Sequence, residues 1–207
     1  MTKTTTALLL LDLQNEMVEP TGKIGGSGLA KVVAARGVLE NAAATLSAAR
    51  ARGVIVAHVR LGFRADYADC LSVAPRITKL KACGAAVLGR WGCEFPAQVA
   101  PLDSEPVFTK QCVNPFFNTG LMSWLLRRGV TDLAIGGVVT NLVVEATARA
   151  ADDAGFAVTV LEDCCAAPNP AWHQFAVENT LPMFGSLART ADFARAVYDL
   201  SAVPATN

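Results

Sequence analysis

The sequence is poor in the residues from which metal sites are built. Its 207 residues include only two histidines, His58 and His173, which argues against a site with several imidazole ligands. The six cysteines lack the paired C-x-x-C spacing of a zinc site, and a chain with 52% hydrophobic residues can build a core without disulfides. We therefore expect reduced thiols, no metal and no other cofactor. The cysteines are Cys70, Cys83, Cys93, Cys112, Cys164 and Cys165.

An excess of one charge and long apolar runs are also missing. Lysine plus arginine number 18 and aspartate plus glutamate 18, so the formal net charge is zero and no basic field attracts nucleic acid or an anionic membrane. The longest apolar run before Asp12 has five residues, too short for a secretory signal or a membrane span. These absences predict a cytoplasmic protein that binds neither nucleic acid nor membrane. The near-zero charge and apolar composition favour a homo-oligomer, either a dimer or a tetramer.

What the chain does contain is an alternation of strand-length apolar runs with helix-length amphipathic segments. Runs that are continuously apolar, rather than alternating with polar residues, are typical of parallel strands buried on both faces. The predicted strands are residues 6–13, 54–61, 106–110, 132–138 and 157–161. The predicted helices are residues 31–52, 118–128 and 141–154 and one from about Ala171, followed by a last strand and helix.

This order predicts an open, doubly wound α/β fold, in which helices cover both faces of a parallel sheet. No repeat, low-complexity tract or linker interrupts the chain, so residues 1–207 are expected to form one domain. One long irregular stretch, residues 62–105, breaks the alternation, and long loops in compact domains often serve a binding site. Its Arg64, Tyr67 and Trp91 either face a ligand or lie at the surface or at a subunit contact.

Ligands of such sheets bind beyond the carboxyl ends of the strands, where the sequence places two charged residues. Asp12 follows four consecutive leucines, and Lys110 ends another apolar run. Burial would raise the pKa of Asp12 and suit it to proton transfer, whereas a nearby cation would lower it; the plainer alternative is a carboxylate that only bonds to its turn. Lys110 either extends to solvent or pairs with a buried acid. Together they predict a carboxylate–ammonium pair in one crevice, an arrangement kept more often for function than for stability.

The stretch GGVVTNLVVEATAR, residues 136–149, closes another strand and opens a helix. Thr140 is the expected N-cap, and Asn141, Leu142 and Val143 form the expected first turn. Backbone N–H groups and the helix dipole at such a turn would stabilise an anion, for example a thiolate or an oxyanion. The Val143 side chain is expected to face the crevice, but the turn offers no nucleophile.

The segments LLLLDLQN, FTKQCVNPFFNTGL and GGVVTNLVVEATARAADDAGF, in this order and spacing, resemble the isochorismatase-like hydrolase superfamily. GRWGCEF, VTVLEDCCAA and LPMFGSLARTADF extend the likeness over nearly the whole chain. The resemblance implies a Rossmann-like, three-layer α/β/α fold with a six-stranded, mostly parallel sheet. It also implies a catalytic triad of Asp, Lys and Cys, the first two at Asp12 and Lys110. The family pattern places the Cys at Val143, so this chain departs from the family at its nucleophile.

The same resemblance implies the remaining site residues. One implied feature is a cis peptide between Val139 and Thr140 that helps to form an oxyanion hole. The implied substrate-binding residues are Gln14, Asn114, Phe116, Phe117, Val139 and Thr140. The two phenylalanines are equally consistent with packing in the core or at a subunit contact.

A valine cannot attack a carbonyl, and losing the nucleophile of a covalent hydrolase can cost about 10⁶ in kcat. Two hypotheses remain. In the first, the chain is a hydrolase that acts on a small molecule through Asp12 and Lys110 without a covalent intermediate, and cleaves a vinyl ether or a C–N bond. In the second, it is a catalytically silent relative. The silent relative would bind a small ligand or act as an oligomeric interaction module. Isochorismatase itself resembles this chain in having a small non-cysteine residue at that position. The retained Asp12 and Lys110 favour the first hypothesis, and Val143 favours the second.

Other groups are weaker candidates for chemistry. Cys112, Cys164 and Cys165 are predicted to be structural thiols, because none lies at a helix N-terminus that would lower its pKa. The zinc site of nicotinamidase-like members uses an Asp and two His, and only His58 is available near the second strand. We therefore predict that His58 is a hydrogen-bonded residue beside the sheet.

Overall fold

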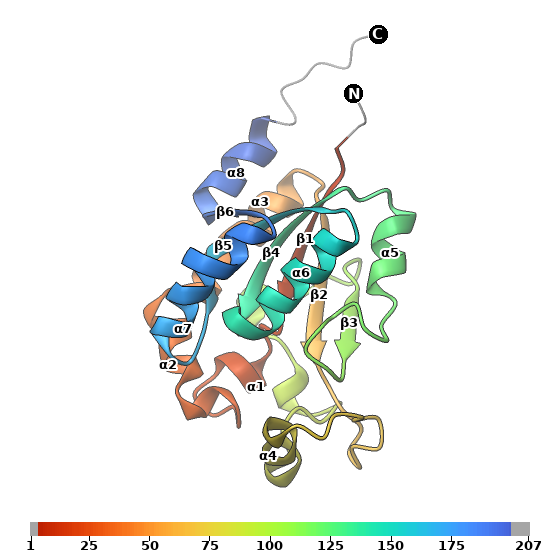
Figure 1. Cartoon of the computed structure of the whole chain (residues 1–207), viewed down its shortest axis with the longest axis vertical. Helices are drawn as coiled ribbons and strands as arrows, with labels where there is room; N and C mark the ends of the chain where they lie inside the picture. Colours follow the sequence, from red (N-terminus) through yellow and green to blue (C-terminus); the bar gives the residue numbers. More distant parts are fainter. Residues whose placement is uncertain (1–3, 200–207) are drawn as a thin grey trace.

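Six parallel strands form one sheet in the computed structural model, which describes residues 4–199 (Figure 1). The strands are β1 (Thr6–Leu11), β2 (Ile55–Leu61), β3 (Val107–Lys110), β4 (Asp132–Val138), β5 (Ala157–Ala166) and β6 (Ser186–Ala188). Their order is β3-β2-β1-β4-β5-β6, and every neighbouring pair is parallel. The order reverses between β1 and β4, and ligands of such sheets bind at this switch point. The predicted α/β fold with a parallel sheet is confirmed.

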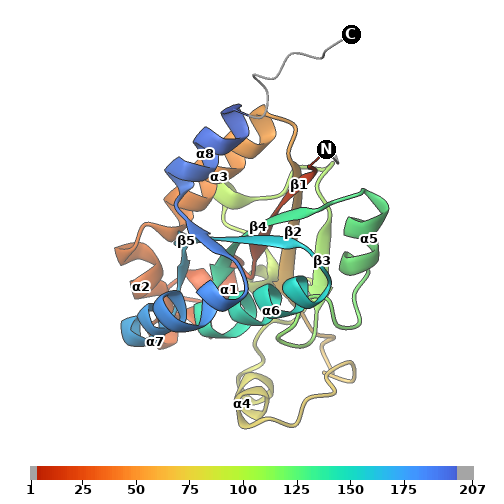
Figure 2. The same cartoon turned by 45° about the horizontal axis from the view of Figure 1, so that its top comes forward.

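Helices cover both faces of the sheet, which explains the continuous apolar runs. Leu8 and Leu10 of β1 pack on one face with residues of α2, α3 and α8, whereas Leu9 and Leu11 pack on the other with residues of α5 and α6. Figure 2 shows α3 and α8 side by side on their face. The helices are α1 (Asn15–Val18), α2 (Leu29–Ala35), α3 (Val38–Ala51), α4 (Pro75–Cys83), α5 (Leu121–Arg127), α6 (Glu145–Asp153), α7 (Pro170–Phe175) and α8 (Thr190–Asp199).

The structure corrects three predicted elements. The helix predicted over residues 31–52 is two helices, α2 and α3, because the chain turns at Gly37, whose φ of 63° lies in the left-handed region. The strand predicted over 157–161 continues to Ala166, since Cys165 and Ala166 pair with the end of β4. The helix predicted from Asn141 begins with a π-helical turn, η4 (Thr140–Val144), before α6.

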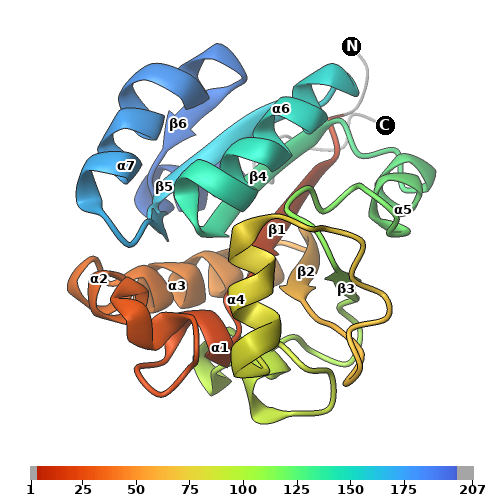
Figure 3. The ribbon, with the colours of Figure 1, turned by 60° about the horizontal axis from the view of Figure 1, so that its bottom comes forward.

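The stretch 62–105 is less irregular than predicted, because it contains α4 and two short 3₁₀ turns. Pro75 opens α4, and Gly84, in the left-handed conformation, ends it. The helix lies across the carboxyl ends of β1 and β2 (Figure 3), where its buried Ile77 packs into the core. It therefore forms one side of the space in which a ligand of this fold would bind.

The predicted single domain spans residues 1–207, of which 1–3 and 200–207 lie outside the described residues. All six strands belong to one sheet. Between residues 4 and 199, no helix combines the length and the apolar character needed to cross a membrane.

Candidate active site

Asp12 and Lys110 form a buried ion pair at the carboxyl ends of β1 and β3. The Lys110 Nζ atom lies 2.7 Å from Asp12 Oδ2, and the two side chains are 2% and 4% exposed. Asp12 has a φ of 55°, a left-handed conformation that Asp tolerates better than most residues and that turns the chain sharply out of β1. Lys110 Nζ also donates to the carbonyl oxygen of Cys112 at 3.1 Å. The structure thus brings together two residues that lie far apart in the sequence.

The burial of this pair determines the protonation behaviour of Asp12. Desolvation raises the pKa of the Asp12 carboxyl, while the charge and hydrogen bond of Lys110 and the nearby backbone N–H of Leu61 act in the opposite direction. Burial has the larger effect, so the pKa lies above its ordinary value. The other carboxyl oxygen, Oδ1, is buried and has no hydrogen-bond partner in the described part of the chain. Asp12 therefore combines a raised pKa with an oxygen that is not engaged by the protein.

Two glycines let the end of β4 approach its neighbours, Gly137 toward β1 and Gly136 toward β5. At Gly137, whose φ is 144°, a Cβ atom would lie 2.0 Å from the carbonyl oxygen of Leu11. At Gly136, a Cβ atom would lie 2.7 Å from the Cβ of Cys164. A larger residue at Gly137 would push β4 away from β1, and one at Gly136 would push it away from β5. Gly137 therefore allows the loop after β4 to lie close to the end of β1, where Asp12 follows.

The turn after β4 differs from the prediction in two ways. The non-proline cis peptide joins Val138 and Val139, not Val139 and Thr140, so it lies at the end of β4, one residue before η4 begins. The N-cap of η4 is Val139 rather than Thr140. The Thr140 hydroxyl does not cap the helix because it shares a 2.9 Å hydrogen bond with Nδ1 of the buried His173.

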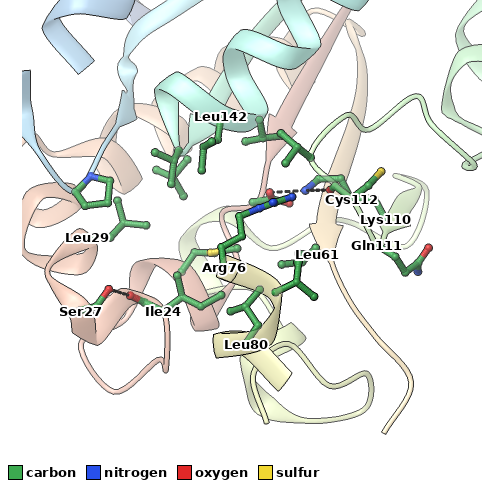
Figure 4. Close-up of a pocket in the computed structure, with 18 residues that line it drawn as sticks. Ile24, Ser27, Leu29, Leu61, Arg76, Leu80, Lys110, Gln111, Cys112 and Leu142 are labelled. Atoms are coloured by element: carbon green, nitrogen blue, oxygen red, sulfur yellow. Dashed lines mark hydrogen bonds and ion pairs between the residues drawn. The ribbon is translucent and has the colours of Figure 1, made fainter. Parts of the chain in front are cut away.

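The ion pair lies in the wall of a cavity of about 230 Å³. Val139, Leu142 and Val143 line it from the β4 side, and Val143 is only 2% exposed. Figure 4 shows the cavity with the Asp12–Lys110–Cys112 contacts as dashed lines. The other lining residues are mainly apolar. They come from the segment that includes α1 and runs to the start of α2, from the ends of β2 and β4, from α4, and from the loops after β3 and β5. They include Met17, Ile24, Ser27, Leu29, Leu61, Arg76, Ile77, Leu80, Gln111, Val113, Val138 and Pro168.

Several residues implied as substrate-binding do not line this cavity. The Gln14 amide donates to the carbonyl oxygens of Leu61 and Gly92 and accepts from the Leu61 N–H, so it holds the end of β1 to its neighbours. Thr140 is buried behind the wall with His173. Of the implied residues, Val139 is the one that reaches the cavity.

The course of the loop after β3 explains why Asn114, Phe116 and Phe117 do not line the cavity. β3 ends at Lys110, and the three residues that follow line the cavity before the chain turns away. Asn114 then accepts from the Phe116 N–H at 2.9 Å, and Phe116 packs against the core formed with α5 and α6. Phe117 is 61% exposed and lines a second hollow with Asp69, Leu71, Ser72, Gln111, Cys112 and Asn118.

The thiols near the site are not activated. Cys112 lines the cavity, but burial raises the pKa of its thiol, which donates to the Asn114 carbonyl oxygen at 3.1 Å. Cys164 and Cys165 lie inside β5, where burial raises the pKa of Cys164 to about 11 and that of Cys165 further still. Neutral thiols are poor nucleophiles. The geometry thus favours structural roles for these cysteines.

Arg76 is the cavity residue that sequence reasoning missed. Of the two alternatives for the residues named in segment 62–105, ligand contact or surface, Arg64 follows the second, since it pairs with Asp66 at the surface. The Tyr67 hydroxyl donates to the Ala85 carbonyl oxygen. Trp91 is 47% exposed and lines a different hollow. The sequence does contain a signal for α4. In PRITKLKACG, the proline is typical of the first turn of a helix and the glycine nine residues later of its end, a pattern that places Arg76 in the helix.

His58 lies away from the cavity. Its Nε2 atom lies 3.2 Å from Glu105 Oε2, and its ring packs edge-on against Phe95. Burial lowers the pKa of His58 despite the nearby carboxylate. This environment matches the predicted hydrogen-bonded histidine beside the sheet.

The buried His173 predicts a pH-dependent stability. Desolvation, with the charge of Arg36, lowers the pKa of His173 to about 4, so the folded chain binds fewer protons than the unfolded chain between about pH 4 and pH 6.5. The free energy of unfolding should therefore rise with pH across this window. Acidification from above to below this window should lower it by about 3 kcal/mol through the protonation of His173. Urea unfolding at several pH values will measure it, with His173→Asn as the variant that removes the titration. Equal pH slopes for the two proteins would contradict the assignment.

Comparisons with known proteins agree with this architecture. The model of the isochorismatase domain matches residues 6–192. The isochorismatase family protein YecD of Escherichia coli O157:H7 is 35% identical over 182 residues, which cover 86% of this chain and 88% of YecD. The ureidoacrylate amidohydrolase RutB of Variovorax paradoxus (strain S110) is 30% identical over 202 residues, 91% of this chain and 80% of RutB.

A solved structure extends the similarity to three dimensions. The crystal structure of an isochorismatase family protein from Desulfovibrio vulgaris subsp. vulgaris str. Hildenborough superimposes with a TM-score of 0.81 at 26% identity. The match covers 95% of this chain and all 100% of that chain. The domain match, which extends from β1 into α8, and the similarity to this solved structure lead to the same conclusion. This chain belongs to the isochorismatase family.

Proposed function

We propose that the chain is a hydrolase of a small molecule that works by acid–base chemistry, with Asp12 as the acid and without a covalent intermediate on the enzyme. The observation that carries this proposal is the buried Asp12–Lys110 pair in the wall of a cavity where the facing helix presents Val143. An isolated buried pair is a poor way to gain stability, and perturbed acids in cavities are typical of functional sites.

The chemistry that best uses these groups is cleavage of a vinyl ether. Protonated Asp12 donates a proton to the terminal carbon of the C=C bond, and the ether oxygen stabilises the cation that forms. Water then adds to this cation with loss of a proton, and the resulting hemiketal collapses to an alcohol and a carbonyl compound. Lys110, at 2.7 Å, stabilises the carboxylate that remains after the proton has left. Val143 contributes an apolar wall and takes no part in bond making.

A substrate panel separates this proposal from covalent amide hydrolysis. The wild-type chain should turn over a vinyl ether, and Val143→Ala should keep most of that activity because no bond forms at residue 143. Amide hydrolysis through a nucleophile at this position should be negligible in both proteins, since the loss of such a nucleophile costs about 10⁶ in kcat. Steady-state assays over vinyl ethers, amides and carbamoyl compounds will measure these rates.

Val143→Cys is the complementary variant. A thiol would stand beside Asp12 at the start of a helix, where its pKa is lowered, and we expect amide hydrolysis at least about tenfold above the wild-type level. Such a gain would support the placement of residue 143 at the family's nucleophile position. Loss of vinyl ether turnover in Val143→Ala would count against the mechanism.

The second candidate is a silent family member that binds a small ligand, and Val143 is the observation that favours it. Ligand binding in the same cavity without turnover of any compound in the panel would favour this candidate. Turnover that depends on Asp12 would exclude it. The oligomer, the cytoplasmic location and the absence of a metal or cofactor stay predictions.

A further inference from the structure

The turn η4, which carries Val143 into the cavity wall, has no side-chain cap at its start. Its N-cap is Val139, whose apolar side chain cannot accept a hydrogen bond from the free N–H groups of the first turn. The next residue, Thr140, is fully buried and lies outside the cavity wall. Its hydroxyl shares the 2.9 Å hydrogen bond with Nδ1 of His173, and no other side chain of residues 139–144 makes a hydrogen bond. The contact between Thr140 and His173 therefore anchors the start of η4.

His173 is itself held in place by α7. Pro170 opens this helix, and the Asn169 side chain caps it by accepting from the Ala171 N–H at 2.9 Å. The helix packs against η4, and His173 is only 3% exposed. The imidazole ring thus belongs to a capped element, whereas η4 has no such cap of its own.

Glu162 determines the direction of the hydrogen bond. Its carboxylate lies 3.9 Å from Nε2 of His173 and also accepts from Arg36 at 3.1 Å and from Arg189 at 2.8 Å. Burial, with the charge of Arg36, lowers the pKa of His173 to about 4, so the ring is neutral at pH 7 and carries a single N–H. The carboxylate favours that hydrogen on Nε2. Nδ1 then accepts the hydrogen of the Thr140 hydroxyl.

We propose that His173 is a positioning residue, which holds η4 in place by accepting the hydroxyl hydrogen of Thr140. It thereby fixes Val139 and Val143 in the cavity wall that they share with Asp12. The His173 side chain lies outside this wall, so it acts through Thr140 and not on the substrate. Loss of the bond leaves a buried polar group without a partner, and a shift of η4 would relieve that cost. Small displacements of this kind within a site lower kcat strongly.

The effect on turnover rests on the proposed function and is measured with two pairs of variants. Thr140→Val and His173→Leu each remove one partner with little change in size. Each should lower kcat for vinyl ether cleavage about tenfold, while KM changes less than about twofold. The double variant should be no slower than the slower single variant, because both changes remove the same bond. Thr140→Ser keeps the hydroxyl and His173→Asn keeps an acceptor near Nδ1, so both should stay within about threefold of the wild-type kcat.

His58→Leu is the matched control. His58 is the other histidine of the chain, is fully buried and is bonded to Glu105 through Nε2, but it lies away from the cavity. This variant should lower stability and leave kcat of the folded protein close to wild type. Thermal unfolding will verify that each variant is folded, and Thr140→Val serves alone if His173→Leu does not fold.

A second measurement locates η4 without any turnover. In the Val143→Cys background, mass spectrometry follows alkylation of the introduced thiol by iodoacetamide at pH 7. The reactivity of this thiol depends on its position relative to the charged pair and the helix start. Adding Thr140→Val or His173→Leu should therefore change the alkylation rate at least about threefold. Adding Thr140→Ser or His58→Leu should leave the rate unchanged.

Three kinetic results would overturn the proposal: a wild-type kcat in folded Thr140→Val, a rate in Thr140→Ser as low as in Thr140→Val, or a loss of kcat in His58→Leu as large as in His173→Leu. Alkylation rates that do not respond to Thr140→Val or His173→Leu would overturn it whether or not the wild type is active. A wild type that turns over no compound of the panel, with alkylation rates that do respond, would instead reject the proposed reaction and retain the positioning role of His173.

Discussion

Replacing Asp12 with asparagine should lower kcat for vinyl ether cleavage by about a thousandfold, within the range that a positioned proton donor contributes. Asparagine has nearly the shape of aspartic acid but has no proton to transfer to carbon. The remaining rate would come from binding of the substrate in the cavity and from the electrostatic effect of the positive charge of Lys110. Because only protonated Asp12 donates, and because burial raises its pKa, wild-type kcat should fall as the pH rises through that raised value.

This variant needs a control for folding, since it leaves the Lys110 ammonium buried without a counter-charge. Glu16→Gln is matched to it. Glu16 is also a buried carboxylate near the end of β1, and it accepts from the backbone N–H groups of Lys23 and Ala86, but it does not line the cavity. Glu16→Gln should lower stability and leave kcat of the folded protein close to wild type. Equal losses of kcat in the two variants, or a rate in Asp12→Asn close to wild type, would contradict the role of Asp12.

Replacing Lys110 with methionine should destabilise the fold by about 3–5 kcal/mol at pH 7, because it leaves a buried carboxylate without a counter-charge. The carboxyl can avoid this state by binding a proton, so its folded-state pKa would rise further above the unfolded value. The folded protein would then bind more protons than the unfolded chain. The contribution of Asp12 to the free energy of unfolding should be most favourable below about pH 4. It should decrease as the pH rises, by at most about 1.4 kcal/mol per pH unit.

Urea unfolding of the wild type, the two single variants and the double variant Asp12→Asn/Lys110→Met will measure this coupling. The double variant replaces both charges with neutral groups of similar size and should regain much of the stability, without the pH dependence of Lys110→Met. Strictly additive effects would show that the 2.7 Å contact contributes nothing, and would count against a desolvated pair.

The positions of Asp12 and Lys110 at strand ends were predictable, because Asp12 directly follows one apolar strand and Lys110 is the last residue of another. Asp12 comes directly after four leucines, and such a run must be buried on both faces, so its carboxyl end lies at an edge of a parallel sheet. For Lys110 the pattern was weaker, because β3 is an edge strand and its residues before Lys110 are only half-buried. The prediction needed no contact information, because the carboxyl ends of parallel strands meet at one edge.

Local patterns failed where a side chain's partner lies far along the chain. Gln14 has the position of a ligand-binding residue, but Leu61 and Gly92 occupy its amide. Thr140 has the chemistry of an N-cap, but His173 takes its hydroxyl. A local pattern cannot reveal such competition, because these hydrogen bonds join residues more than thirty positions apart.

The amino-acid sequence by itself determined the layered α/β architecture, the acid and the amine at its strand ends, and the valine at residue 143, since strand periodicity and residue identity are local properties. Only the tertiary structure decided that α4 lies over these strand ends and brings Arg76 into the same cavity. The physical reason is that a side chain's surroundings depend on the packing of distant segments. Here residues from the end of β1 to the loop after β5 enclose one space.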